Sequence, residues 1–260
     1  MYAEFLLSRE QSNRFIYTKV HQANIGLHFH SQLEFYLIES GEMEVWINGY
    51  YKKMKAGDIS LAFSFDAHAY RTTKECTAYV VIIPTDLCPD ILSELQHKRP
   101  RIPFINAPEL YKLIQNCCEE IKKEPRSITS RGYLYVMLGT LLKKTELTEL
   151  SEPMETDRIT RLLFYVNDHF HENLTLSDVA RQFGYSASYL SRHFKTTFQI
   201  GFSQYVTMLR LRAAVNKLRE GGATIETVLT ESGFSSTRTF YRAFAAEFGC
   251  SPKKYLQGEN

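Results

Sequence analysis

The sequence predicts an α+β protein in which a small antiparallel β-barrel comes first, a helix pair follows, and an all-α domain ends the chain. Three observations predict this order. Residues 15–84 hold short apolar or alternating runs between turn residues, which is typical of strands. Residues 110–144 carry apolar residues at helical spacing, and residues 159–256 contain a duplicated helical pattern. With 260 residues, 44% of them apolar and 23% charged, the chain is long enough for two domains with separate cores.

Composition excludes several classes of protein. The five cysteines are odd in number and show no Cys-x-x-Cys spacing, so we expect buried, reduced thiols rather than disulfides or a zinc site. No run approaches the roughly 18 apolar residues of a membrane span, and no secretory signal is recognisable. We therefore expect a cytoplasmic protein with no membrane partner. A net charge of +2 is too small to indicate a nucleic-acid partner by itself.

The strands of the front half are separated by turn signals. The run Glu34–Glu39 is expected to end at Ser40-Gly41, and a further run covers Met43–Ile47. Asn48-Gly49 then lies between two aromatic or β-branched runs, which predicts a hairpin because both residues tolerate positive φ. Gly57-Asp58 ends the next run. We expect six or more short antiparallel strands in a small barrel or sandwich.

Two amphipathic helices are expected after the strands. The first has one apolar stripe and ends near Pro125, and the second runs from Arg131 to Lys144. The apolar face of the second helix comprises Leu134, Met137, Leu138, Leu141 and Leu142. This face either covers the sheet or forms the seam of a homodimer, and both interpretations stay open.

A boundary is predicted at Thr145–Asp157, which is acidic, contains Pro153 and lacks apolar periodicity. The predicted division is therefore residues 1–100 for the β-domain, residues 101–152 for the helical linker or dimerisation region, and residues 153–260 for the helical domain.

The helical domain contains an internal repeat. Residues 175–185 align with residues 224–234 at an offset of 49, and the offset becomes 50 after the shared glycine. Each copy starts with a threonine that can cap a helix, ends that helix at Gly184 or Gly233, and continues into a second helix. The pattern predicts a helix-turn-helix present twice, joined by a helix from about Ser203 to Arg219.

The second helix of each copy is expected to show a polar, basic face to solvent. These faces carry Ser188, Ser191, Arg192 and Lys195 in the first copy, and Thr237, Arg238, Tyr241 and Arg242 in the second. Arginine can bind both acceptors of guanine, and serine or threonine suits either kind of base edge. An ordinary solvated face is the alternative for one copy alone. Two copies on a rigid connection favour binding to double-stranded DNA, at major-groove segments about 34 Å apart.

Three motifs lie within residues 159–256: TLSDVARQFGYSASYLSRHFK, RLRAAVNKL and ESGFSSTRTFYRAFAAEFGCSPKKY. In the last, Pro252 would open a short helix and Tyr255 would complete the second core. These motifs resemble the DNA-binding domain of the AraC/XylS transcriptional regulators. The resemblance implies base contacts from Ser188, Ser191, Arg192, Arg238, Thr239 and Arg242. It also implies a homodimeric transcriptional activator without catalytic activity, with RNA polymerase as a further partner.

Two histidine motifs in the front half resemble those of cupins. The first is Gly26-Leu-His28-Phe-His30 followed by Glu34, and the second is Gly57-Asp58 leading to His68. In metal-using cupins such residues converge on one divalent ion, so a metal-dependent enzyme or a metal-sensing regulator is the alternative. We expect no metal and no cofactor, because the second motif lacks its usual proline and glycine before His68.

The cupin-like domain is instead expected to bind a small-molecule effector, such as a carbohydrate, through hydrogen bonds from its histidines. Tyr36 continues the strand face of Glu34, and Trp46 would stack on a sugar ring. The predicted effector site comprises His28, His30, Glu34, Tyr36, Trp46 and His68.

Overall fold

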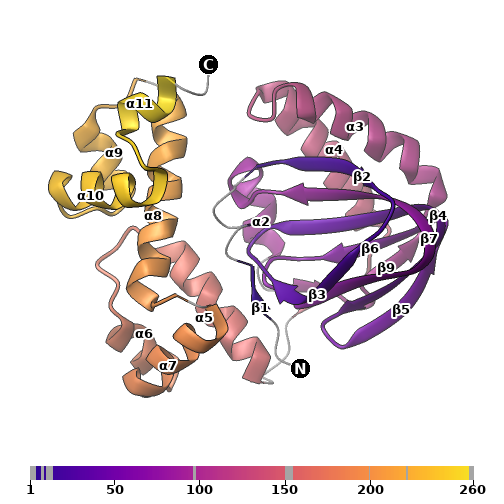
Figure 1. Cartoon of the computed structure of the whole chain (residues 1–260), viewed down its shortest axis with the longest axis horizontal. Coiled ribbons are helices and arrows are strands. Elements are labelled where there is room, and N and C mark those ends of the chain that lie inside the picture. Colours follow the sequence, from indigo (N-terminus) through magenta and orange to yellow (C-terminus); the bar gives the residue numbers. More distant parts are fainter. Residues whose placement is uncertain are drawn as a thin grey trace. The chain divides into compact units, whose positions relative to one another are not determined.

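The chain folds into two compact units, residues 1–153 and residues 154–260. The computed structural model describes residues 4–6, 9, 14–95, 98–149, 155–198, 200–220 and 222–257. Figure 1 shows a sheet with helices in the first unit and only helices in the second. Within the described ranges, no helix combines the length and apolar character that crossing a membrane requires.

The first unit is built on one strongly bent, eight-stranded sheet (Figure 1). Its strands are β1 (Glu4–Phe5), β2 (Ile16–Val20), β3 (Asn24–Phe29), β4 (Leu33–Ile47), β5 (Tyr50–Lys55), β6 (Asp58–Ala62), β7 (His68–Ile83) and β9 (Phe104–Asn106). The order is β1-β3-β7-β4-β6-β9, with β2 also on β7 and β5 also on β4. Pairing is antiparallel except between β1 and β3. The predicted antiparallel architecture is confirmed, but the hydrogen-bonded path among the described strands is open rather than closed into a ring.

The expected strand end at Ser40-Gly41 is wrong, because β4 continues through it. Its register on β7 shifts between Ile38 and Ser40 and again between Gly41 and Met43, which marks an irregularity of the bulge type. Gly41 has φ +77°, and a Cβ there would lie 2.0 Å from the backbone oxygen of Glu75. Only glycine fits this bend, so β4 and β7 each run as one long strand instead of two short ones.

The Asn48-Gly49 hairpin is confirmed. Both residues have positive φ, 47° and 82°, and β4 pairs with β5 directly across them. Gly57 also has positive φ, 93°, between β5 and β6. The turn signals therefore set the boundaries of β5 and β6.

The first part of β4, residues 33–38, is buried on both faces, because α3 (Tyr111–Lys123) and α4 (Ile128–Lys143) cover its outer face. Leu33, Phe35 and Leu37 pack against these helices, while Tyr36 and Ile38 belong to a second core inside the bend. The side chains of α4 in the outer core are Leu134, Met137, Leu138 and Leu141. The leucine face therefore covers the sheet and is not available as a dimer seam.

Short elements connect the sheet to its helices. They are η1 (Thr85–Leu87), α2 (Pro89–Leu95), β8 (Lys98–Pro100), η2 (Pro108–Leu110) and β10 (Leu147–Glu149). Strand β10 lies in the stretch expected to be a linker without regular structure, and it pairs antiparallel with β8. Three paired residues are too few to produce a detectable hydrophobic pattern, which explains the missed strand.

The second unit contains the predicted repeat. Its helices are α5 (Glu155–His169), α6 (Leu176–Gln182), α7 (Ala187–Phe198), α8 (Phe202–Glu220), α9 (Ile225–Glu231), α10 (Thr237–Phe248) and α11 (Pro252–Gln257). Helices α6 and α9 correspond at an offset of 49, and α7 and α10 at an offset of 50. The side chains of Thr175 and Thr224 cap α6 and α9, and each accepts one hydrogen bond from the backbone N–H three residues later. Both duplicated glycines adopt left-handed φ, so the sequence alignment is also a structural one.

The turn after α5, residues 170–172, connects the two repeats of this unit. Arg210 of α8 donates from its guanidinium to the backbone oxygens of Phe170 and Glu172, at 2.7 Å each. The α9–α10 turn closes on the same segment, where the Cα of Gly233 has no room for a side chain beside His171. The turn after α5 therefore contacts both the connecting helix and the second repeat.

Candidate functional site

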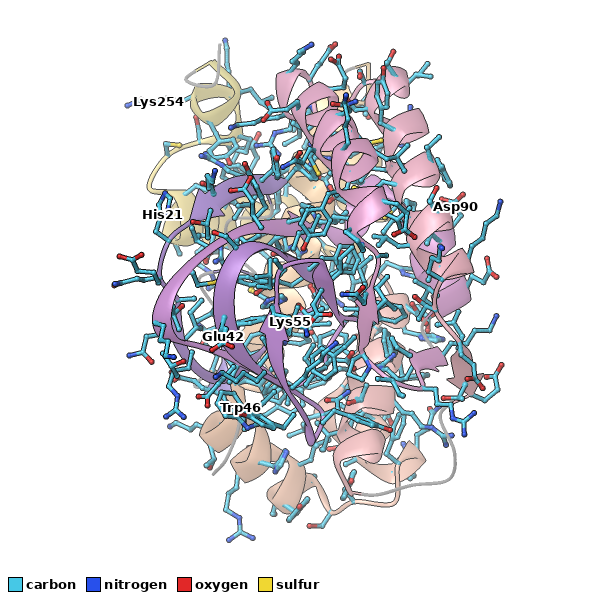
Figure 2. All side chains as sticks on the ribbon, turned by 90° about the vertical axis from the view of Figure 1, so that its right-hand side faces the viewer. His21, Glu42, Trp46, Lys55, Asp90 and Lys254 are labelled. Carbon is cyan, nitrogen blue, oxygen red and sulfur yellow. The ribbon has the colours of Figure 1, made fainter. Side chains whose placement is uncertain are left out.

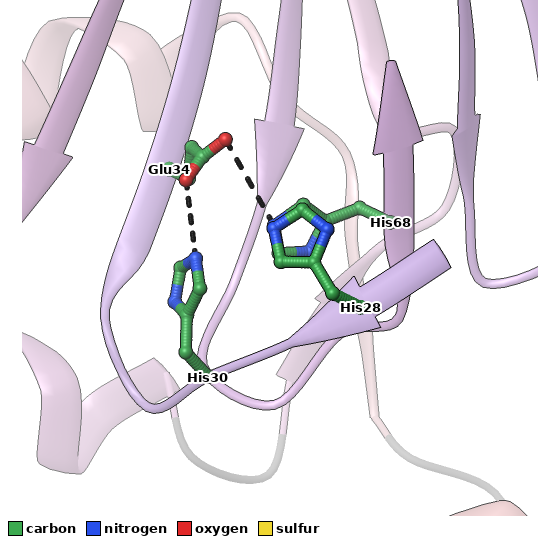
Figure 3. Close-up of side chains that lie close together, drawn as sticks. All are labelled: His28, His30, Glu34 and His68. Carbon is green, nitrogen blue, oxygen red and sulfur yellow. Dashed lines mark hydrogen bonds and ion pairs between the residues drawn. The ribbon is translucent and has the colours of Figure 1, made fainter. Parts of the chain in front are cut away.

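Four polar side chains converge inside the bend of the sheet (Figure 3). His28 lies on β3, His30 follows that strand, Glu34 lies on β4, and His68 begins β7. Backbone pairing places His28 directly opposite His68. All four side chains are buried, and one potential ligand atom from each lies within 4.8 Å of the others. The structure thus brings together the four residues that the two cupin-like motifs singled out.

Hydrogen bonds fix how these side chains point. His30 Nε2 lies 3.1 Å from Glu34 Oε2, and His68 Nε2 lies 3.9 Å from Glu34 Oε1. On the other side of the rings, His28 Nδ1 donates to the Gly26 carbonyl at 2.8 Å and His68 Nδ1 to the Asp66 carbonyl at 2.7 Å. Because a carbonyl only accepts, these bonds keep the proton on Nδ1 when the rings are neutral. Nε2 of both rings then carries a lone pair.

The site is arranged to hold a carboxylate beside neutral imidazoles. Burial opposes ionisation of Glu34, but the hydrogen bond from His30, and the positive charge that the neighbouring rings carry once they are protonated in acid, lower the pKa of Glu34 to about 2. Burial lowers the pKa of His68 to about 3 and also lowers the pKa of His28. At neutral pH Glu34 is therefore ionised, while His28 and His68 are uncharged.

Two tyrosines extend the site into the sheet. Tyr36 packs on Tyr70 with ring centroids 4.0 Å apart, and Tyr70 lies 5.6 Å from the ring of His68. Burial raises the pKa of both hydroxyls, so they remain protonated. Sequence reasoning placed Tyr36 at the site but missed Tyr70. The signal was available, because Tyr70 is two residues after His68 on the same strand and shares its face.

A buried ion pair holds Asp66, the residue whose carbonyl accepts the hydrogen bond from His68. Asp66 Oδ1 lies 2.6 Å from Arg99 Nε, and Asn48 and the Phe63 N–H also donate to the Asp66 carboxylate. Arg99 lies on β8 and donates as well to the Ser64 carbonyl at 3.0 Å. Sequence reasoning missed Arg99, since no local pattern links it to a turn more than thirty residues earlier.

Trp46 does not join the site. It alternates on β4 with Val45 and Ile47, which are buried in the inner core, so its ring lies on the other face of the strand. There it packs on Tyr51, with centroids 5.1 Å apart, and under the guanidinium of Arg71. Figure 2 marks it on the β4–β5 hairpin together with Glu42 and Lys55. The expectation of sugar stacking by Trp46 in the pocket is therefore wrong.

The second unit exposes the predicted faces of α7 and α10. The exposed residues are Ser188, Ser191, Arg192, Lys195, Thr237, Arg238, Tyr241 and Arg242. Opposite them, Leu190, Phe194, Phe240 and Phe244 are fully buried. Thr239 is only half-buried and its hydroxyl is hydrogen-bonded to Ser236, the residue that caps α10. Both helices therefore combine a buried aromatic face with an exposed polar and basic one.

The basic residues of α8 have partners within the protein. Arg210 holds the turn after α5, Lys217 pairs with Glu231 at 2.7 Å, and Arg219 lies over the ring of Tyr255. These contacts hold α8 between the two repeats. Arg210, Lys217 and Arg219 therefore stabilise the folded unit by binding groups within the protein.

Two family models match separate parts of the chain. The family model for an AraC-like ligand-binding domain matches residues 14–138, and a helix-turn-helix domain model matches residues 179–258. The chain is 28% identical over 251 residues to the HTH-type transcriptional activator RhaS of Escherichia coli, covering 92% of this chain and 90% of that protein. Neither comparison points to a metal-dependent enzyme.

Solved structures are matched as well. ToxT from Vibrio cholerae O395 is 13% identical with a TM-score of 0.41, covering 93% of this chain and 96% of that one. The C-terminal domain of AraT, a response regulator from Geobacillus stearothermophilus, is 29% identical with a TM-score of 0.37, covering 39% of this chain and 84% of that one. The two family matches, the RhaS relative and the duplicated helix-turn-helix identify the chain as a DNA-binding transcriptional regulator of the AraC/XylS family, with an N-terminal ligand-binding domain.

Proposed function

We propose that α7 and α10 are the DNA-reading helices and that they enter two adjacent major-groove segments of one operator. The observation that carries this proposal is the repeated helix-turn-helix, with an exposed arginine, Arg192 or Arg242, at the equivalent position of each second helix. The proposed contacts are Ser188, Ser191, Arg192, Lys195, Thr237, Arg238, Thr239 and Arg242. Among these Thr239 has the least support, because its hydroxyl is engaged in the cap.

The test is operator binding by the full chain, using a DNA fragment selected from the genome by the protein itself. Arg192→Ala and Arg242→Ala should each weaken specific binding by about 1–3 kcal/mol, the cost of one base-reading arginine. Arg101→Ala is the matched control, because it removes the same charge from an exposed site in the first unit. Equal affinity of all four proteins would reject the assignment of the reading helices.

The effector site is proposed to comprise His28, His30, Glu34, Tyr36 and His68. Imidazole nitrogens, a carboxylate and tyrosine hydroxyls suit a hydroxyl-bearing metabolite, so carbohydrates are the first class to test. The effector would act by stabilising one arrangement of the protein more than another, without catalysis. A carbohydrate panel in a thermal-shift assay identifies it, and Tyr36→Phe should reduce the shift while leaving operator binding without effector unchanged.

We further propose a homodimeric activator that acts in the cytoplasm, with residues 1–100 as effector domain, 101–152 as linker and 153–260 as DNA-binding domain. Activation and contact with RNA polymerase are inferred from the kind of relative found, RhaS, which is named a transcriptional activator. Exposed apolar residues on the outer side of α4, Ile128, Tyr135 and Val136, support a dimer contact there. Light scattering of the purified chain, with and without Val136→Glu, tests this interface.

A further inference from the structure

The two helix-turn-helix repeats pack on different halves of α8. In the first half, the ring of Tyr205 contacts the rings of Phe194 and Phe198 on α7, with centroids 5.8 Å apart in both pairs. In the second half, Leu211 and Val215 belong to the core that contains residues of α9 and α10. Lobes that share few contacts move relative to one another by default. The distance and angle between α7 and α10 therefore depend on what holds the two lobes where the halves of α8 meet.

The turn after α5 contacts α8 at this junction. Arg210 immediately precedes Leu211, and its guanidinium donates through Nε to the Phe170 carbonyl and through Nη2 to the Glu172 carbonyl. Hydrogen bonds from a charged donor are about twice as strong as neutral ones, and two donors on one planar group also fix its orientation. The side chain of Arg210 therefore holds the turn against the middle of α8.

The same turn meets the second repeat without any space between the two backbones. A Cβ on Gly233, in the turn between α9 and α10, would lie 2.5 Å from the Cα of His171. The neighbouring Ser232 is buried, and its hydroxyl donates to the carbonyls of Val228 and Leu229, which fixes the end of α9. Movement of the second repeat toward α5 is therefore blocked by backbone contact.

Helix α5 connects this turn to the first repeat. The ring of Tyr165 on α5 lies 5.6 Å from that of Phe183, the residue that ends α6. A second connection between the repeats therefore runs beside α8. It leads from the first repeat through α5 to residues 170–172, and from there to Arg210 and Gly233.

We propose that this second connection fixes the separation of α7 and α10 and makes operator affinity depend on the spacing of the two DNA segments. Arg210 is then a positioning residue that determines spacing specificity without touching DNA. The proposal rests on α7 and α10 being the reading helices. One added base pair rotates the second segment by about 34–36° and moves it by about 3.4 Å, because a helical turn holds 10–10.5 base pairs. A reader of fixed geometry loses the second set of contacts after such a change.

The experiment measures binding of the full chain to the selected operator fragment and to derivatives with one base pair added or removed between the two protected segments. The parent should bind the altered operators at least about tenfold more weakly, the cost of the base contacts of one helix. Arg210→Met should bind the original operator about three- to tenfold more weakly, because a smaller fraction of molecules has the competent arrangement. The penalty for altered spacing should shrink by a similar factor.

Two further variants test whether the effect comes from the hydrogen bonds of Arg210. Arg210→Lys keeps the charge and one donor group but not the two-pronged geometry, so its spacing penalty should lie between those of the parent and Arg210→Met. Arg219→Met is the matched control, because it removes the same charge from α8 at a residue that lies over Tyr255, within the second repeat. Its spacing penalty should equal that of the parent.

A structural role alone would not change the dependence on spacing. A fragment with one half-site needs only one repeat, so Arg210→Met should bind it as the parent does, and circular dichroism must show that each variant is folded. Gly233→Ala disturbs the same connection from the second repeat and should also reduce the spacing penalty. The proposal is wrong if both folded variants keep the parent's spacing penalty, if Arg210→Met loses half-site binding, or if the parent binds all spacings equally. The assignment of the reading helices is decided separately, by Arg192→Ala and Arg242→Ala.

Discussion

The internal repeat allows one prediction with its control built into the chain. Gly184 and Gly233 occupy equivalent positions with nearly equal φ, +73° and +78°, but their surroundings differ. Nothing lies within 4 Å of a Cβ added at Gly184, whereas a Cβ at Gly233 would lie 2.5 Å from His171 Cα and 2.6 Å from its oxygen. Alanine at either position therefore incurs the same backbone strain, and only Gly233→Ala also forces the repeat away from the turn after α5.

The magnitudes follow from these distances. Left-handed backbone for a residue with a Cβ costs about 1–2 kcal/mol at both positions. Ordinary carbon contacts are about 3.5–4.0 Å, so His171 must retreat by about 1 Å in Gly233→Ala. Overpacking of that size costs about 1–3 kcal/mol. We expect Gly184→Ala to lose about 1–2 kcal/mol and Gly233→Ala about 2–5 kcal/mol.

The assay is urea unfolding of the full chain followed by two signals. Trp46 is the only tryptophan and lies in the first unit, so its fluorescence follows that unit, while circular dichroism follows the helices of both. Gly233→Ala should shift the helical transition and leave the Trp46 transition in place. Gly249→Ala, also at positive φ with nothing within 4 Å, should match Gly184→Ala. Equal destabilisation of all three variants would refute the argument that the turn after α5 clamps the second repeat.

Three further predictions concern the first unit. In chelator-treated protein, burial holds the pKa of His68 at about 3 in the folded state, below its ordinary value of 6.5. The free energy of unfolding should therefore be highest above pH 6.5 and lower by about 2 kcal/mol at pH 5, because the unfolded chain then binds a proton that the folded chain does not. An unfolding free energy, followed by Trp46 fluorescence, that stays constant from pH 5 to pH 7 would contradict this. Arg99→Met should cost about 3–5 kcal/mol because it leaves the Asp66 carboxylate buried without its cation, whereas Arg101→Met at an exposed pair should cost less than about 1 kcal/mol in the same titration. Leu138→Ala should cost about 2–5 kcal/mol in unfolding experiments without changing the mass measured by light scattering, and a monomer produced by this change alone would restore the leucine face as a dimer seam.

The elements that could be predicted from the sequence are those that depend on nearby residues. The hairpin at Asn48-Gly49, the stripes of α3 and α4 and both helix-turn-helix copies depend on turn chemistry or helical period, which a sequence displays directly. The histidine cluster could also be predicted, because strand alternation puts His28 and His30 on one side and the motif spacing adds Glu34 and His68.

What failed depended on tertiary context. Ser40-Gly41 has the composition of a turn, but long-range pairing with β7 carries the strand through it as a bulge. Trp46 was assigned to the pocket on its chemistry alone, although the bulges at Gly41 decide which face of β4 it occupies. Tyr70 was overlooked, and the pairing of β8 with β10 joins segments almost fifty residues apart and leaves no local signal.

The carboxylate of Asp66 gathers three distant parts of the chain. It accepts hydrogen bonds from Asn48 in the β4–β5 hairpin and pairs with Arg99 on β8, while the backbone oxygen of the same residue holds the ring of His68. Strand β8 in turn pairs with β10, the last described element before the chain continues into the helical unit. Asp66 thus connects the ring of His68 with the β4–β5 hairpin and, through Arg99, with the β8–β10 pair at the C-terminal end of the first unit.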